Sequence, residues 1–333
     1  MKKVILFFLL VALLFACCKS CNNSRKKSET TQYMHTPKRA MYHWKNTYDL
    51  SYEELNFMKE HRIERLYVRF FDVTLENIID GFGPRPIPTA SVVIKQPWNI
   101  DFPEIVPTIF ITPEAMSDIC KKGQARNIAK KMLERIDHMR SFYDIPKNKV
   151  REIQIDCDWT PSIEQGFFSF CKEVRRQMPD TALLSCTIRL HQLRKQMPPV
   201  DYGVLMLYNT NNLRDFSVKN SILSADDMKP YLKHVQCDLP LDLAYPTFAW
   251  DLWFHKGQFQ GILRSTCQAD SLRRRGETIK HEESSFNEIM AVKKLVEKRL
   301  PKPKHGRSTI LYHLDKNNIK RYNYDEIEII FGD

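Results

Sequence analysis

The chain has 333 residues, and its 51 Lys and Arg against 40 Asp and Glu give a formal net charge of +11. Beyond the first 39 residues no linker rich in Pro, Gly or Ser divides the sequence, so its length suits one large α/β barrel as well as two small domains. Nine Cys without the spacing of a zinc site exclude a zinc-finger type of protein, and we expect neither a metal nor a cofactor.

The N-terminus has the features of an export signal. A basic start is followed by an apolar run, residues 4–15, that is too short to span a bilayer, and a small residue then precedes Cys17. The run Leu14–Cys17 resembles the lipobox of bacterial lipoproteins, which implies cleavage before Cys17 and its acylation. We therefore predict a signal peptide over residues 1–16 and a lipid anchor, such as palmitate, at Cys17. Cleavage before Cys18, an ordinary cleaved signal and an uncleaved anchor are the alternatives.

Residues 17–39 are polar, rich in Ser, Thr, Asn and Lys, and free of apolar periodicity. This composition predicts a flexible tether between the membrane and a folded domain over residues 40–333. We expect an outer-membrane lipoprotein of the cell envelope that faces the periplasm or the cell surface. Nucleic acid is an unsuitable partner for an exported protein, so the basic runs indicate solvated faces, or a surface for anionic lipid or acidic glycan.

Strand-like and helix-like patterns alternate along the folded domain. The eight strand-like runs are residues 40–44, 65–73, 106–112, 152–158, 183–190, 202–209, 241–246 and 309–314. Helical periodicity marks residues 51–61, 125–143, 162–177, 225–234 and 286–299, and Ser162 with Gln165 has a capping-box pattern. This alternation predicts a single (β/α)8 barrel of the TIM type. A doubly wound open sheet is the alternative, but no Gly-rich phosphate motif follows the first strand.

The run of residues 152–158 holds the strongest candidate for chemistry. Strand alternation places Gln154, Asp156 and Asp158 on one face and apolar residues on the other, so the polar row points into the barrel mouth. Two neighbouring carboxylates raise the cost of ionising each other, which keeps one of them protonated near neutral pH. We predict Asp156 and Asp158 as a catalytic pair. The alternative is a structural network with Arg69 or Arg189.

Other strand ends supply aromatic and polar residues, which is the composition of a sugar site, because rings stack on pyranose faces while polar groups fix hydroxyls. Some of these residues also have ordinary structural explanations: a Trp can serve only packing, Arg189 can neutralise carboxylates, and His191 can be structural. Our predicted substrate-binding residues are Trp44, Arg69, Gln154, Trp159, Arg189, His191, Tyr208, Asn209, Tyr245 and Trp250.

Two short motifs carry a family resemblance. Residues 155–159 resemble the later part of the strand-four signature of family 18 glycoside hydrolases, the chitinases and their relatives, and residues 206–209 resemble the family's Met-x-Tyr-Asp/Asn element on strand six. The resemblance implies that the two aspartates orient and charge-balance a substrate acetamido group that attacks the anomeric carbon, and that Tyr208 helps to hold it. The chain is also similar to exported barrel lipoproteins of Bacteroidetes that share the Gln-x-Asp-x-Asp pattern.

The sequence departs from this family at one decisive position. Thr160 stands where the family has its acidic glutamate, and a missing general acid costs a factor of ~10²–10⁴ in rate. Asp158, Glu164 and Glu114 are the carboxylates that remain, and a raised pKa would let Asp158 donate a proton beside a charged Asp156. We therefore expect a lipid-anchored glycoside hydrolase that acts on a glycan. A non-catalytic carbohydrate-binding barrel and a structural envelope lipoprotein are the alternatives.

Overall fold

The computed structural model describes residues 35–78, 83–97, 103–233, 235, 237–263, 265–304 and 306–332. The chain divides into a unit of residues 1–34 and a compact unit of residues 35–333, so the predicted signal peptide and Cys17 lie outside the described residues. Within the described ranges, no helix combines the length and the apolar character that crossing a membrane requires.

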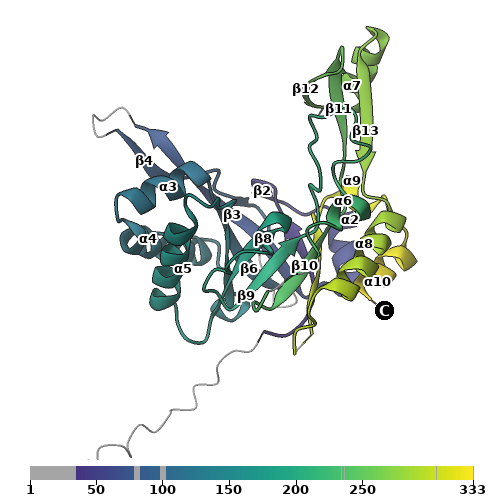
Figure 1. The fold of residues 1–333 in the computed structure, drawn as a ribbon. Coiled ribbons are helices and arrows are strands. Elements are labelled where there is room, and N and C mark those ends of the chain that lie inside the picture. The colour runs from purple at the N-terminus through teal and green to yellow at the C-terminus, as the bar shows by residue number, and fades with distance from the viewer. Residues whose placement is uncertain are drawn as a thin grey trace, which may run out of the picture. The chain divides into compact units, whose positions relative to one another are not determined.

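Eight parallel strands close into a barrel (Figure 1). In chain order they are β1 (Arg39–His43), β3 (Arg65–Asn77), β6 (Glu104–Ile111), β7 (Glu152–Asp156), β8 (Leu183–Arg189), β9 (Tyr202–Met206), β10 (Leu241–Pro246) and β14 (Thr309–Tyr312). Neighbours along the chain pair in parallel, and pairing of β1 with both β3 and β14 closes the ring. The predicted (β/α)8 fold is confirmed, since every predicted strand is present, and an open doubly wound sheet is excluded.

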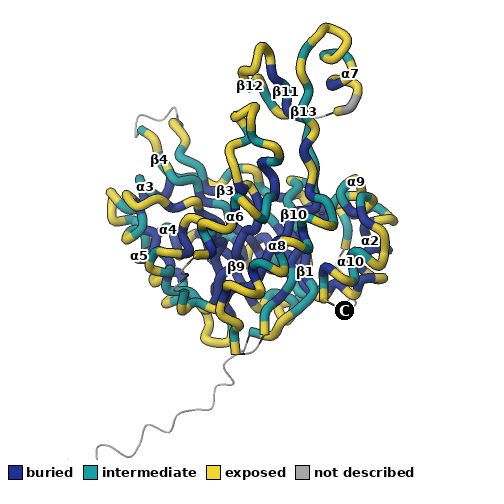
Figure 2. Tube along the Cα trace, turned by 45° about the vertical axis from the view of Figure 1, so that its right-hand side comes forward, coloured by how far each residue is buried: buried dark blue, intermediate teal, exposed yellow. Residues whose placement is uncertain are grey.

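Helices cover the outside of the barrel, and the core lies between them and the strands, as the buried central part of Figure 2 shows. They are α2 (Tyr52–Glu60), α3 (Pro113–Lys121), α4 (Ala125–Phe142), α5 (Glu164–Gln177), α6 (Ala225–Met228), α8 (Phe286–Arg299), α9 (Lys316–Ile319) and α10 (Tyr324–Phe331), with short 3-10 turns η1 (Lys147–Lys149) and η2 (Leu190–Gln192). Cys157, Cys171 and Cys186 are buried, free thiols in this layer, as expected for small core residues.

Two helical details differ from the prediction. The helix expected over residues 225–234 ends at Met228, because Pro230 has no N–H to continue the ladder. The capping box at Ser162 is wrong as well: α5 is preceded by Ile163 without a side-chain cap, and the Ser162 hydroxyl bonds Thr160 Oγ1 at 2.8 Å instead.

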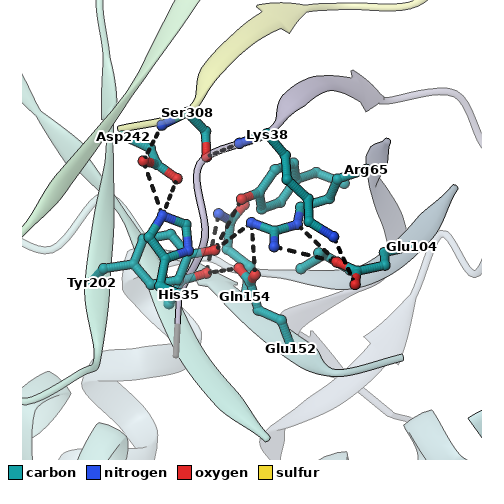
Figure 3. Close-up of polar contacts among 12 residues, drawn as sticks. His35, Lys38, Arg65, Glu104, Glu152, Gln154, Tyr202, Asp242 and Ser308 are labelled. Carbon is teal, nitrogen blue, oxygen red and sulfur yellow. Dashed lines mark hydrogen bonds and ion pairs between the residues drawn. The ribbon is translucent and has the colours of Figure 1, made fainter. Parts of the chain in front are cut away.

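The first described residues close the N-terminal end of the barrel (Figure 3). The His35 ring stacks on Tyr202 with centroids 3.9 Å apart, and its Nε2 lies 3.0 Å from Asp242. The Lys38 backbone N–H donates to Ser308 Oγ, and its ammonium pairs with Glu104 at 2.8 Å. Each of these partners lies within the first two residues of a barrel strand or directly before it. Residues 35–38 therefore contact the barrel before β1 begins at Arg39.

A three-stranded antiparallel sheet interrupts the barrel after β10. It consists of β11 (Ala249–His255), β12 (Gln258–Leu263) and β13 (Thr278–Glu283) in the order β12-β11-β13, with α7 (Thr266–Arg274) between the last two. We call residues 249–283 the finger. It stands out from the barrel at the end opposite the first described residues (Figure 1). Smaller additions are β4 (Pro84–Thr89), which pairs with β3, and the short pair β2 (Thr47–Tyr48) and β5 (Val93–Ile94).

Candidate functional site

The predicted carboxylate pair lies at the C-terminal ends of the strands, beside an arginine. Asp156 ends β7 and Arg189 ends β8, so both reach the barrel mouth. Arg189 donates through Nε to Asp158 and through Nη2 to Asp156 at 3.3 Å, and Thr187 Oγ1 donates to Asp156 at 2.5 Å. One guanidinium thus bridges both carboxylates, which is the network that the sequence analysis kept as an alternative.

The two carboxylates differ in their environment. Asp156 is 3% exposed, and burial raises the pKa of its carboxyl, although Arg189 and the Thr187 hydroxyl act in the opposite direction. The Asp158 side chain is 49% exposed and shares a charge-assisted hydrogen bond with Arg189. The sequence analysis expected a raised pKa at Asp158. In the structure it is Asp156 whose pKa is raised by burial.

A cavity of about 440 Å³ opens beside this cluster. Its walls come from the ends of β7, β8 and β9 and from the chain after α6. The lining residues are Asp158, Trp159, Thr160, Arg189, Leu190, His191, Met206, Tyr208, Asn209, Thr210 and Tyr231. Thr210 Oγ1 is buried without a hydrogen-bond partner within the described part of the chain. Six predicted site residues meet here: Asp158, Trp159, Arg189, His191, Tyr208 and Asn209.

Among the described residues that line the cavity, Asp158 is the only carboxylate. Glu114 and Glu164, the other predicted acid candidates, sit in the first turns of α3 and α5, where negative charge complements the helix dipole. His191 is exposed, and partial burial of its ring lowers its pKa despite the nearby Asp158 carboxylate. Asp158 is therefore the charged hydrogen-bond acceptor among the described residues that line the cavity, and Asp156 is buried beside Arg189.

Three predicted ligand contacts present little exposed surface to a sugar. Gln154 is fully buried inside the barrel, where its side chain accepts from the Tyr42 hydroxyl at 2.8 Å. Tyr245 is buried on the helix-facing side of β10. Trp159 lines the cavity but is 1% exposed, and its ring packs on Phe167 and Phe168 of α5. Aromatic or polar character alone does not fix the direction in which a strand-end residue points.

The remaining predicted residues lie at the mouth but not among the cavity's lining residues. Arg69 donates through Nε to Asp72 at 2.7 Å, and its guanidinium lies 5.4 Å from the centre of the Trp44 ring. Trp250 starts the finger, and its Nε1 donates to Glu282 at 3.1 Å. Arg69 therefore pairs with Asp72 and not with Asp156 or Asp158.

Two aromatic residues that the sequence analysis missed connect these groups. The Tyr312 ring at the end of β14 stacks on Tyr208 with centroids 4.9 Å apart and approaches Trp44 at 5.9 Å. Phe248 lies 6.0 Å from Tyr208 and 5.3 Å from Trp250. Its place two residues after β10, and that of Tyr312 at a strand end, were the available signals. Partly exposed rings thus run from β1 across the mouth to the base of the finger.

Comparisons with known proteins relate the chain through its fold. No protein-family model matches the sequence, and no curated protein matches it. Solved structures do match: a chitinase from Bacteroides thetaiotaomicron at TM-score 0.53 and 12% identity, covering 89% of this chain and 97% of that one. A class V chitinase mutant from the plant Cycas revoluta, in complex with (GlcNAc)3, matches with a TM-score of 0.51 and 12% identity, and the match covers 89% of this chain and 100% of that one. The spore cortex-lytic enzyme SleL of Bacillus cereus matches with a TM-score of 0.50 and 13% identity, and the match covers 86% of this chain and 75% of that one. At these identities the likeness establishes the fold.

Proposed function

We propose that the cavity at the barrel mouth binds a glycan. The observation that carries this proposal is the cluster at its floor, where Arg189 holds the exposed Asp158 carboxylate at the opening, close to the Tyr208 ring and the unpartnered Thr210 hydroxyl. A charged acceptor, neutral donors and an aromatic ring converge on a space large enough for a sugar unit. Two matching folds are chitinases, and the one from Cycas revoluta is bound to (GlcNAc)3, which makes an acetamido sugar the first ligand to test.

The geometry favours binding over cleavage. A general acid needs both a proton near neutral pH and access to the leaving group. Burial raises the pKa of Asp156, but this residue does not line the cavity. Asp158 has access, but its carboxylate is engaged by the Arg189 guanidinium. Thr160, at the position of the family's acid, bears only a hydroxyl. The carboxyl group with the raised pKa, Asp156, is thus not the one that lines the cavity, Asp158.

Hydrolysis through the Asp156 and Asp158 pair is the second candidate. It is favoured by the closeness of the two carboxylates around Arg189 and by the glycoside hydrolases among the matching folds. In that mechanism Asp158→Asn keeps the shape but cannot donate a proton, so turnover falls strongly while affinity is largely kept. Asp156→Asn weakens both, because it removes the charge that balances the developing positive centre.

Calorimetric titration with chitooligosaccharides, run beside an assay for new reducing ends, tests both candidates. We expect saturable binding without release of reducing ends. Asp158→Asn should weaken binding about tenfold or more, since a hydrogen bond to a charged group contributes about 1.5–3 kcal/mol. Asp180→Asn, an exposed carboxylate at the closed end of the barrel, is the matched control and should bind like the parent. Reducing ends released by the parent and lost in Asp158→Asn would establish hydrolysis, and equal binding by both variants would reject this cavity.

We also propose that Cys17 carries a lipid and holds the protein in the cell envelope. The basic start, the short apolar run and the Ala16-Cys17 junction support it. Cys17→Ser should abolish labelling by a fatty-acid probe and release the protein from the membrane fraction, whereas Cys21→Ser should change neither. Labelling that persists in Cys17→Ser would move the anchor to another residue.

A further inference from the structure

The outer strands of the sheets differ in how their open edges are protected. A strand edge presents unpaired N–H and C=O groups, which are a template for another strand unless Pro or charged residues block it. Edge strand β4 has Pro84, Pro86 and Pro88 at alternate positions, which removes the donors from one side. Edge strand β13 contains Lys280, His281, Glu282 and Glu283. Both edges are therefore poor partners for a second chain.

Edge strand β12 has neither protection. Its sequence, Gln-Phe-Gln-Gly-Ile-Leu over residues 258–263, contains no Pro and no charged residue. One side pairs with β11, and no other described strand pairs with the opposite side. A register shift between Trp253 and Phe254 of β11 places an irregularity near Gln260, but Gly261, Ile262 and Leu263 pair regularly. The backbone N–H and C=O groups of residues 261–263 that point away from β11 are therefore available for pairing with another strand.

Apolar side chains lie beside this edge. Ile262 is 46% exposed, and Phe216, in the loop after β9, is 48% exposed while its ring contacts Phe254 at 5.1 Å. A β-carbon added at Gly261 would meet no heavy atom within 4 Å, so the space over that face of the strand is open. Most large apolar side chains of the described chain are buried, whereas Ile262 in the unprotected strand and Phe216 against the neighbouring strand β11 are exposed.

We propose that β12 pairs antiparallel with β12 of a second copy of this chain, around a two-fold axis near Gly261. Two copies of this strand are compatible with each other. Because the strand has no charged side chain, self-pairing brings no like charges together. The exposed Ile262 side chains of the two copies approach each other across the axis. An uncharged strand also offers nothing for a charged partner to recognise. The finger stands clear of the barrel, so the edges can meet while the barrels stay apart (Figure 1).

Sedimentation of the mature full chain in a mild detergent tests this pairing. A contact of one short strand is small, so the dimer should form over a range of about 1–100 µM. Ile262→Lys places two positive charges at the axis, and Gln260→Pro removes a backbone N–H and interrupts the strand beside it; both variants should remain monomeric. Ile329→Lys is the matched control, because Ile329 is 42% exposed on α10, and it should dimerise like the parent.

The folded state of each variant is checked by thermal unfolding, and Ile262→Lys alone decides if Gln260→Pro unfolds. A parent that stays monomeric at about 100 µM overturns the proposal. So does a dimer that survives Ile262→Lys, which would place the contact elsewhere, or one lost equally in Ile329→Lys, which would indicate non-specific apolar association.

Discussion

Acidification should destabilise the fold through His43, a buried residue outside the proposed glycan site. His43 ends β1, is 1% exposed, and contacts the Tyr48 ring at 4.8 Å, while its Nδ1 has no hydrogen-bond partner in the described structure. Burial, with smaller effects from Lys45 and His313, lowers its pKa from 6.5 to about 4. The folded state thus binds a proton at His43 less well than the unfolded state does. Stability is complete above pH 6.5 and is lost as the pH falls towards 4.

The size of the loss follows from the shift. A change from 6.5 to about 4 corresponds to about 3 kcal/mol in full, and about 2 kcal/mol of it is lost between pH 7 and pH 5. His43→Phe keeps an aromatic ring in the same place but cannot be protonated. In urea unfolding at both pH values, the parent should therefore lose about 2 kcal/mol more than this variant.

His138→Phe, an exposed ring on α4, is the matched control and should follow the parent. Other groups that titrate in this range act on the parent and on His43→Phe alike, so the difference between the two isolates His43. Equal losses in the parent and in His43→Phe between pH 7 and pH 5 would refute the reasoning.

Three further predictions concern packing and charge. Arg189→Leu leaves Asp156 buried without its cation, so it should lower the free energy of unfolding by about 3 kcal/mol and abolish glycan binding in calorimetry; unchanged binding would remove Arg189 from the site. Gly166→Ala should destabilise by about 1–3 kcal/mol in urea unfolding, because the new Cβ would lie 2.0 Å from Cys120 Sγ, and Cys120→Ala should rescue only part, since the Cys120 Cβ is 2.7 Å away. A Gly166→Ala protein as stable as the parent would contradict this close approach. His35→Ala should cost about 1–3 kcal/mol through its lost bond to Asp242 and lost stacking, and a melting temperature equal to that of the parent would show that the N-terminal segment does not hold the barrel.

The barrel strands were predictable because each carries its own local pattern. In β7, alternation alone placed Gln154 and Asp156 on the inner face, and Arg189 arrived beside Asp156 because parallel strands end at the same side. What alternation cannot give is the direction of the chain once a strand has ended. Trp159 turns back onto α5, and the finger depends on long-range pairing between β11 and β13, which no local pattern encodes. The bridging role of Arg189 likewise depends on side-chain placement across two strands.

The segment at the closed end of the barrel sets where the chain enters the folded domain. His35 and Lys38 contact residues at the starts of the strands, so the chain enters at the pole opposite Asp158 and the cavity. Anything joined before His35, such as a fusion partner or the proposed lipid on Cys17, is therefore attached at the pole that does not carry the cavity opening.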